Sequence, residues 1–177
     1  MTFIVCASGQ SLTQDDVNYC KGKGKVIVIN NTYQLAPWAY ALWACDGVWW
    51  KAYPEAMKFK GRKLSVQNDQ VEKITTIDKA GLGLKKVHTG GNGGYQAINW
   101  AFLQGAKKII LLGFDMHGTH WHGLHERGLN NCHPFAQWIT AFNRMAKDIE
   151  KTDTKVINCT PNSALDCFKK QDLRKTI

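Results

Sequence analysis

The chain has 177 residues, of which 44% are hydrophobic and 21% charged, and these proportions fit one globular domain and exclude a largely disordered chain. The net charge of +9 attracts anionic partners in general, but no zinc finger, RNA-binding signature or recognition-helix pattern indicates a nucleic-acid target. No apolar run is long enough to cross a bilayer and no basic leader precedes the first strand, so we expect no membrane association, a cytoplasmic location and reduced thiols at Cys6, Cys20, Cys45, Cys132, Cys159 and Cys167.

The start of the chain predicts a strand, a helix and a second strand. An apolar strand at residues 3–7 leads through a polar turn into a helix, for which Thr13 is a suitable N-cap. An aliphatic strand follows at residues 25–29 and ends in two asparagines. A βαβ unit of this kind favours a parallel sheet whose ligands bind at the carboxyl ends of the strands.

The next part of the chain has weaker patterns. The elements expected there are a short helix at 36–44, a short strand at 46–50, a helix beginning near 53 and a strand at 63–66. Residues 68–86 are ambiguous, and we expect an irregular edge hairpin at 71–77.

The second half resumes the alternation. A glycine-rich stretch precedes an apolar helical pattern, which Gly105 ends, and a continuous aliphatic strand follows at 109–112. After a histidine-rich loop or lid at 117–133, Pro134 is expected to begin a helix; a strand at 154–158 and a short helix at 164–169 follow. We therefore predict an α/β fold, with one doubly wound domain at 1–177 and a mostly parallel sheet flanked by helices.

The glycine-rich stretch is a candidate phosphate site. Four of the five residues at 90–94 are glycine, and the interrupting residue is Asn92. Glycines let a ligand approach the backbone, and the free N–H groups and dipole of a helix N-terminus favour an anion. We expect a phosphate-bearing ligand beside residues 92–95, with Asp115 close by.

Polar residues follow most of the predicted strands and should converge at one sheet edge. They are Ser8, Gly9, Gln10 and Ser11, then Asn30 and Asn31, then Asp46, then Asp115, and finally Asn162 and Ser163. As single positions they are more typical of turns and helix caps than of a binding site; as a set they favour a nucleotide-sized ligand. The chain has neither G-x-G-x-x-G nor GxxxxGK[ST], which argues against hydride transfer and P-loop ATP hydrolysis.

The histidine-rich segment admits three interpretations. His117, His120, His122, His125 and His133 could include an acid/base group, ligands of a zinc ion, or only the polar side chains of a loop. Three tryptophans are also ambiguous. Trp49, Trp50 and Trp121 suit stacking on a sugar or base, and for Trp49 and Trp50 core filling suits the pattern equally well. The site assignment contains no metal ligand.

Several short motifs, in this order, resemble bacterial lipooligosaccharide sialyltransferases. They are Ala-Ser-Gly-Gln-Ser-Leu at 7–12, Asn30, Gly93-Gly94, Ile-Ile-Leu-Leu-Gly-Phe-Asp-Met at 109–116 and Cys-Thr-Pro-Asn-Ser at 159–163. The arrangement is also similar to Rossmann-like hydroxymethylpterin pyrophosphokinases. It resembles most closely short bacteriophage proteins, which share the Asp-Gly-Val-Trp-Trp and histidine segments, and a phage origin would imply the host cytoplasm.

The resemblance implies a Rossmann-like domain with a nucleotide-sugar site. Ser8, Gly9 and Ser11 would face the donor phosphate, Asn30 the nucleotide, and residues 92–94 the ribose or base. A general base would be His125, with His133 second. Ser8 replaces an asparagine of the family and Asn92-Gly93 replaces Thr-Ser, so the fold carries over better than the reaction.

These patterns and the resemblance lead to one preferred function, a glycosyltransferase-like enzyme that uses a nucleotide sugar, such as a CMP-linked one, without a tightly bound cofactor. The alternatives are a nucleotide-binding protein without turnover and a pyrophosphokinase-like transferase with Mg²⁺ near Asp46 and Asp115. The catalytic candidates are His125, His133 and Asp115. The nucleotide-binding candidates are Ser8, Gly9, Gln10, Ser11, Asn30, Asn31, Asn92, Gly93, Gly94, Tyr95, Asn162 and Ser163. The substrate-binding candidates are Asp46, Trp49, Trp50, Met116, His120, Trp121 and His122.

Overall fold

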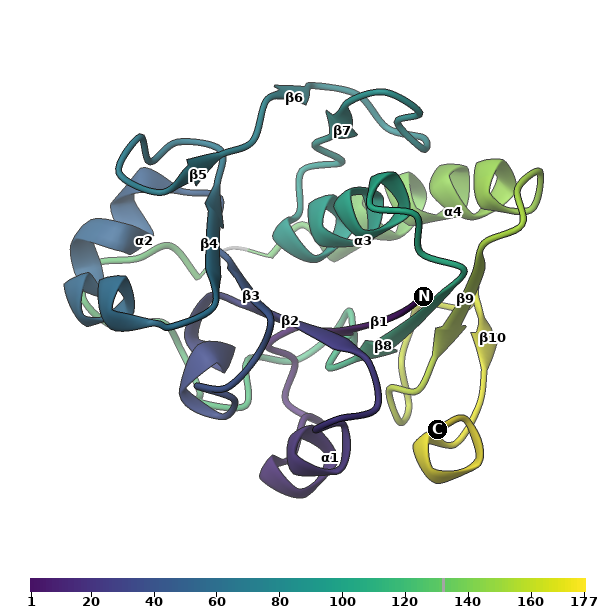
Figure 1. The fold of residues 1–177 in the computed structure, drawn as a ribbon, viewed down its shortest axis with the longest axis horizontal. Helices are drawn as coiled ribbons and strands as arrows, with labels where there is room; N and C mark the ends of the chain where they lie inside the picture. The colour runs from purple at the N-terminus through teal and green to yellow at the C-terminus, as the bar shows by residue number, and fades with distance from the viewer. Residues whose placement is uncertain (132) are drawn as a thin grey trace.

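A parallel sheet of eight strands forms the centre of the fold, as a computed structural model describes it for residues 1–131 and 133–177 (Figure 1). The strand order is β10-β9-β8-β1-β2-β3-β4-β5, and every pair within this sheet is parallel. The strands are β1 (Thr2–Cys6), β2 (Lys25–Ile29), β3 (Ala41–Trp43), β4 (Arg62–Ser65), β5 (Glu72–Lys73), β8 (Lys108–Leu112), β9 (Lys155–Asn158) and β10 (Lys169–Lys170). The α/β class with a parallel sheet is thus confirmed.

Strand β1 lies where the strand order reverses. From β1 the chain builds the sheet outward through β2 to β5, and it then returns to the other side of β1 with β8 and continues to β9 and β10. Phe3 is paired with Lys25 of β2 on one side and with Ile109 of β8 on the other. At such a reversal the connections leave in opposite directions and open a crevice at the carboxyl ends of the strands.

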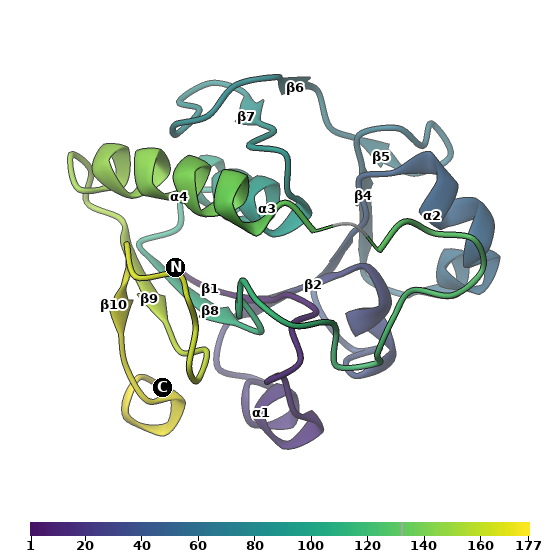
Figure 2. The same cartoon turned by 180° about the vertical axis from the view of Figure 1, so that it is seen from behind.

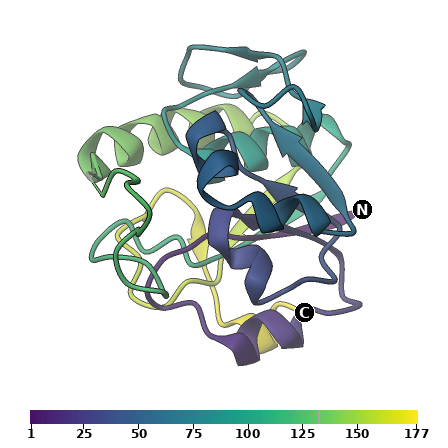
Figure 3. The same ribbon diagram turned by 90° about the vertical axis from the view of Figure 1, so that its left-hand side faces the viewer.

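Helices pack against both faces of the sheet (Figure 2). The long helices α3 (Gly93–Leu103) and α4 (Phe135–Ile149) cover one face, where Ile98 and Phe142 join the side chains of β1 and β8. The other face is covered by α1 (Gln14–Tyr19), α2 (Gly47–Ala52), and the 3₁₀ helices η1 (Asn30–Gln34), η2 (Pro54–Lys58) and η3 (Leu173–Lys175). In the side view, α4 in light green and α1 in purple lie on opposite sides of the strands (Figure 3). None of the helices in the described residues is both long and apolar enough to cross a membrane.

Where a local signal and tertiary packing agree, the predicted elements are found. Helix α1 begins after Thr13, whose hydroxyl accepts a hydrogen bond from Asp16 N–H as an N-cap should. Strand β2 occupies the predicted residues, and α4 follows Pro134 with Phe142 and Met145 buried. The thiols of Cys6, Cys20, Cys45, Cys159 and Cys167 are free, as expected, while Cys132 lies outside the described residues.

The predicted helix at 36–44 and strand at 46–50 are both wrong. Residues 41–43 form β3, whose three side chains are buried between β2 and β4, and residues 47–52 form α2. Tertiary burial overrides helix propensity in the first case. In the second case the aromatic pair that suggested a strand is buried from a helix, where the Trp50 indole N–H donates to the Ala44 carbonyl at 2.9 Å.

The predicted hairpin at 71–77 and the helix at 164–169 are also wrong. Strand β5 pairs with β4 in parallel, while β6 (Thr76–Ile77) pairs in parallel with β7 (Val87–His88) in a separate two-stranded sheet. The chain near residue 164 instead runs through turns, and β10 joins the sheet edge beside β9. These short edge pairings depend on partners distant in sequence, so a local pattern does not specify them.

Candidate functional site

A cavity of about 420 Å³ opens at the carboxyl ends of the central strands. Its wall contains the chain that leaves β1, β2, β3 and β8, the N-termini of α3 and α4, and part of the histidine segment. A volume of this size lies in the range of small-molecule sites, and the position is the crevice beside the strand-order reversal.

The turns after β1 and β8 are bonded to each other at the base of the cavity. Gly9 N–H donates to the Gly113 carbonyl at 2.9 Å. A Cβ atom on Gly9 would lie 1.9 Å from Asp115 Oδ2, so only glycine allows the turn to approach that carboxylate. Asp115 is buried, and it accepts hydrogen bonds from Ser11 N–H at 3.1 Å and from the Ser11 hydroxyl at 3.0 Å. Asp115 therefore holds the two turns together while lining the cavity.

Two non-glycine residues of the cavity wall have left-handed backbone conformations. Asn30, directly after β2, has φ of +46°, and Met116, after β8, has φ of +57°. Such conformations cost free energy and are found preferentially at functional sites. Asp46, which follows β3, also lines the cavity. The sequence pattern predicts Asp46 at the edge of a strand at 46–50, but the strand is at 41–43.

The N-terminus of α3 faces the cavity, as expected. Asn92 is its N-cap, with the side-chain oxygen accepting from Tyr95 N–H at 3.0 Å. Gly93 and Gly94 line the cavity in the first helical turn, where N–H groups have no carbonyl partner within the helix. Phe135 and Trp138 of α4 also line it, so two helix N-termini, with their partial positive charge, meet at one cavity.

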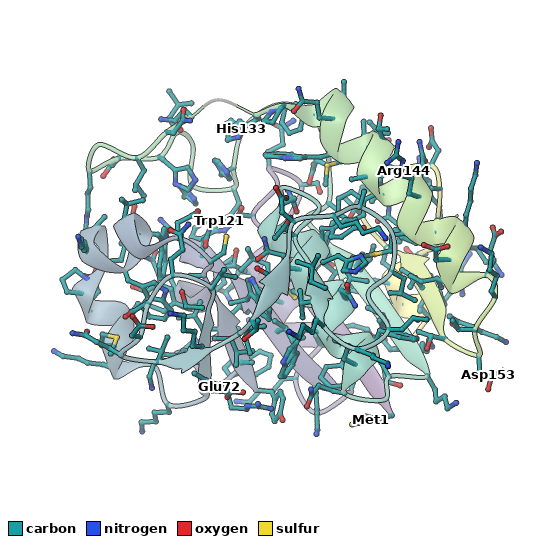
Figure 4. All side chains as sticks on the ribbon, turned by 90° about the horizontal axis from the view of Figure 1, so that it is seen from above. Met1, Glu72, Trp121, His133, Arg144 and Asp153 are labelled. Atoms are coloured by element: carbon teal, nitrogen blue, oxygen red, sulfur yellow. The ribbon has the colours of Figure 1, made fainter. Side chains whose placement is uncertain are left out.

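The described residues of the histidine segment form an irregular loop that is hydrogen-bonded to the segments following β1 and β2. Trp121 N–H donates to the Ser8 carbonyl at 2.9 Å, and the Trp121 indole N–H donates to the Thr32 hydroxyl at 3.1 Å. Further along, His125 N–H donates to Asn131 Oδ1 at 2.6 Å, and the Asn131 amide donates back to the His125 carbonyl at 3.0 Å. In Figure 4, Trp121 and His133 mark this loop beside the start of α4. These hydrogen bonds hold the backbone of the loop at Trp121 and at His125.

Four imidazoles of this loop gather beside the cavity. Potential ligand atoms of His120, His122 and His125 all lie within 4.8 Å of one another. The ring of His133 lies 4.9 Å from that of His120, centroid to centroid. One ring nitrogen of each is buried and has no hydrogen-bond partner among the described residues: His120 Nδ1, His122 Nε2, His125 Nδ1 and His133 Nε2.

Burial favours the neutral form of these imidazoles, and for His120, His122 and His125 the neighbouring histidines act in the same direction. Desolvation, followed by the neighbouring histidines, lowers the pKa of His120 and that of His125 to about 4. Desolvation also lowers the pKa of His122 and His133. A neutral imidazole has one nitrogen lone pair available for a proton or a metal ion.

The cavity wall contains carboxylates and imidazoles but, within the described chain, no lysine or arginine. Its ionisable side chains include Asp46 and Asp115. Cys45 also lines it, and burial, followed by the charge of Asp46, raises the pKa of its thiol to about 12, so this thiol stays protonated and is a poor nucleophile at neutral pH. A phosphate bound here would depend on backbone N–H groups and helix dipoles, or on an added cation.

Most predicted site residues do meet at this cavity. Those that line it are Ser8, Gly9, Asn30, Asp46, Asn92, Gly93, Gly94, Asp115, Met116, His120, His125 and His133. Ser11 and His122 are not among the lining residues, but each is next to one that is. Ser11 is hydrogen-bonded to Asp115, and His122 belongs to the histidine cluster with His120. The Gln10 side chain reaches the loop instead, accepting from Thr119 N–H at 3.5 Å.

Other predicted site residues support the fold. Trp49 and Trp50 are buried in the core and Asn31 accepts from the Trp49 indole N–H at 2.7 Å, so the burial supports core filling and not stacking on a substrate. Tyr95 is fully buried, with its hydroxyl bonded to the Gly81 carbonyl. The remaining three also serve structure: Trp121 anchors the loop, Ser163 donates to the Phe114 carbonyl, and the Asn162 carbonyl pairs with the His117 ring.

The structure adds cavity residues that the sequence did not indicate. Phe135 and Trp138 line the wall from the first turn of α4, and Gln96 does so from α3. The only sequence signal for this part of the wall was Pro134, which predicted where α4 begins. It did not predict that the first turn of α4 would lie at the cavity. The Mg²⁺ alternative stays a prediction: Asp46 and Asp115 both line the cavity, and Mg²⁺ is usually held by one or two carboxylates together with substrate phosphates.

Comparisons of the chain with protein-family models, curated proteins and solved structures find no match. The functional argument therefore depends on the geometry of the cavity.

Proposed function

We propose that this chain is a transferase that binds a nucleotide sugar in the cavity and passes the sugar to an acceptor hydroxyl. We further propose that its sheet is of the doubly wound, Rossmann-like type. The observation that carries the proposal is that the glycine-rich start of α3, Asn30 after β2 and the histidine loop line a single cavity beside the strand-order reversal.

The donor would lie with its phosphate against the first turn of α3. N–H groups of Gly93 and Gly94 point out of the helix end, and the start of α4 adds a second positive dipole. Asn30 presents an amide for base or ribose from a backbone conformation held at the end of β2. These groups also suit the departing nucleotide, whose phosphate gains negative charge as the sugar leaves.

The acceptor would approach from the histidine wall. His125 and His133, the predicted general base and its second choice, both line the cavity, as does His120. Because this wall and the start of α3 line the same cavity, a sugar held between them would be open to attack by an acceptor hydroxyl.

A ligand panel tests the proposal. Thermal unfolding would be followed with CMP, UMP, GMP and AMP and with their nucleotide sugars, and nucleotide release from each sugar would be measured with candidate acceptors. We expect a rise in melting temperature with one nucleotide class, since a ligand at 100 times its Kd stabilises by about 2.7 kcal/mol. A shift without nucleotide release would favour the binding protein without turnover, and no shift with any ligand would refute the proposal.

A further inference from the structure

The histidine loop contains a feature that nucleotide binding does not explain. His120, His122 and His125 follow the spacing His-x-His-x-x-His, and one potential ligand atom of each lies within 4.8 Å of the others. Each of the three also has a buried ring nitrogen without a hydrogen-bond partner among the described residues. The side chains are stacked and tilted against one another, with centroids of His120 and His125 at 4.2 Å. The three imidazoles are therefore closely packed although each has a buried ring nitrogen that lacks a hydrogen bond.

The described residues offer these nitrogens no compensation. A buried nitrogen without a partner costs about 1–3 kcal/mol, and here three such atoms are adjacent. Protonation is an unfavourable remedy, since it would place like charges on rings about 5 Å apart in a partly buried setting. A single cation that is coordinated by the lone pairs of all three imidazoles removes this cost.

The ligand atoms are close to the geometry that such a cation needs. Zinc binds imidazole nitrogen at about 2.0–2.1 Å, which places tetrahedral ligand atoms roughly 3.4 Å apart. The present separations are at most 4.8 Å, so small side-chain rotations in the loop would complete the site. The hydrogen bonds between Trp121 and Ser8 and between His125 and Asn131 hold the backbone on both sides of the cluster.

We propose that His120, His122 and His125 bind one divalent first-row transition-metal ion of the zinc type. Three imidazoles select such an ion over Mg²⁺ or Ca²⁺, which prefer oxygen ligands. The ring of His133 lies 4.9 Å from that of His120, centroid to centroid, but His133 is not one of the three grouped ligands. With three protein ligands the ion keeps one position for water or substrate, as in catalytic zinc sites.

This inference goes beyond the transferase proposal, because it stands on the histidine side chains alone. If both hold, the ion would place positive charge beside a cavity that has no lysine or arginine among its described lining residues. In that case His125 would be a ligand of the ion and not the general base, and the ion would supply that function by lowering the pKa of a bound water.

Direct metal binding is the test. The full chain, purified without a histidine tag and stripped with a chelator, would be titrated with Co²⁺ by visible absorption and with Zn²⁺ against a chromophoric chelator. We expect one ion per chain, a Co²⁺ spectrum of low coordination number, a raised melting temperature, and no competition from millimolar Mg²⁺. Each of His120→Gln, His122→Gln and His125→Gln should weaken binding by more than about 100-fold, beyond the loss caused by removing a supporting partner.

His117→Gln is the matched control. His117 belongs to the same loop, but its ring nitrogen pairs with the Asn162 carbonyl, outside the cluster. It should bind metal as the unchanged chain does, and His133→Gln should lose less affinity than the three ligand variants. Circular dichroism of each metal-free variant checks that it folds. Absence of stoichiometric binding, or equal losses in His117→Gln and the ligand variants, would overturn the proposal. Nucleotide shifts measured without metal report on the transferase proposal separately.

Discussion

Ser11 holds the buried Asp115 carboxylate with two hydrogen bonds, although the two residues are 104 positions apart in the chain. One bond comes from the backbone and one from the hydroxyl, and together they fix the turn after β1 to the turn after β8. The base of the cavity depends on this link, because Gly9 and Gly113 meet at the same place.

Ser11→Ala should destabilise the fold by about 1.5–3 kcal/mol, since it removes a hydrogen bond to a buried charged group while leaving the carboxylate in place. Urea unfolding followed by circular dichroism measures the change. Ser8→Ala is the matched control: Ser8 lies in the same turn, and the hydrogen bond that it accepts, from Trp121 N–H, is at its backbone carbonyl and is kept in the variant. Equal losses in both variants would show that the Ser11–Asp115 bond is not the cause.

Gly9→Ala should destabilise the protein by about 1–3 kcal/mol through overpacking, because the new Cβ would overlap Asp115 Oδ2 and the Gly113 carbonyl. Gly93→Ala provides the comparison, since its Cβ would have only ordinary contacts, the nearest being Ile29 Cγ2 at 3.5 Å. Its melting temperature should stay unchanged or rise. A Gly9→Ala protein as stable as the unchanged chain would contradict the described approach of the two turns.

Asn30→Gly should weaken binding of the nucleotide found in the panel while leaving the apo protein folded. Glycine accepts a φ of +46° without strain, so the variant removes the side-chain amide and little else. Loss of one hydrogen bond predicts a roughly 3–10-fold rise in Kd, measurable by calorimetry.

Asn162→Gly is the control for that measurement, because Asn162 also has a positive φ, +53°, but its side chain does not line the cavity. Its nucleotide affinity should not change. If both variants bind as the unchanged chain does, Asn30 has no role in ligand recognition.

Asp148→Asn should reduce stability at neutral pH by no more than about 1 kcal/mol, because the carboxylate is partly exposed. The hydrogen bond from Leu82 N–H, followed by Lys151, lowers the pKa of Asp148 from its ordinary value of 3.8. The stabilisation is therefore present above that value and is lost as the pH falls through the lowered pKa.

Unfolding curves between pH 2 and pH 7 would show this as a difference between Asp148→Asn and the unchanged chain that disappears in acid. Asp153→Asn is a suitable control. The Asp153 side chain is 91% exposed and its carboxylate lies 3.5 Å from the Lys107 ammonium, so this ion pair is on the surface and contributes little to stability. A difference that persists at the lowest pH would mean that the charge of Asp148 is not responsible.

Local sequence was enough to predict the central βαβ unit, α3, β8 and α4. Thr13 marks a helix start by its own hydroxyl, and the residues of β2 after Lys25 are continuously aliphatic, a pattern typical of a buried strand. The convergence of Asn30, Gly93 and Asp115 followed as well, since parallel strands bring their carboxyl ends to one edge.

Tertiary structure decided the features that depend on distant partners. Residues 41–43 became a strand because β2 and β4 flank them, and Trp49 and Trp50 became core residues because the sheet lies beneath α2. The histidines were visible in the sequence, but their spacing allowed a metal site, an acid/base group or a polar loop. Only the folded loop, which is hydrogen-bonded through Trp121 to the end of β1, brings a potential ligand atom of each of three histidines within 4.8 Å of the others, because side-chain proximity follows from packing in space and not from order along the chain.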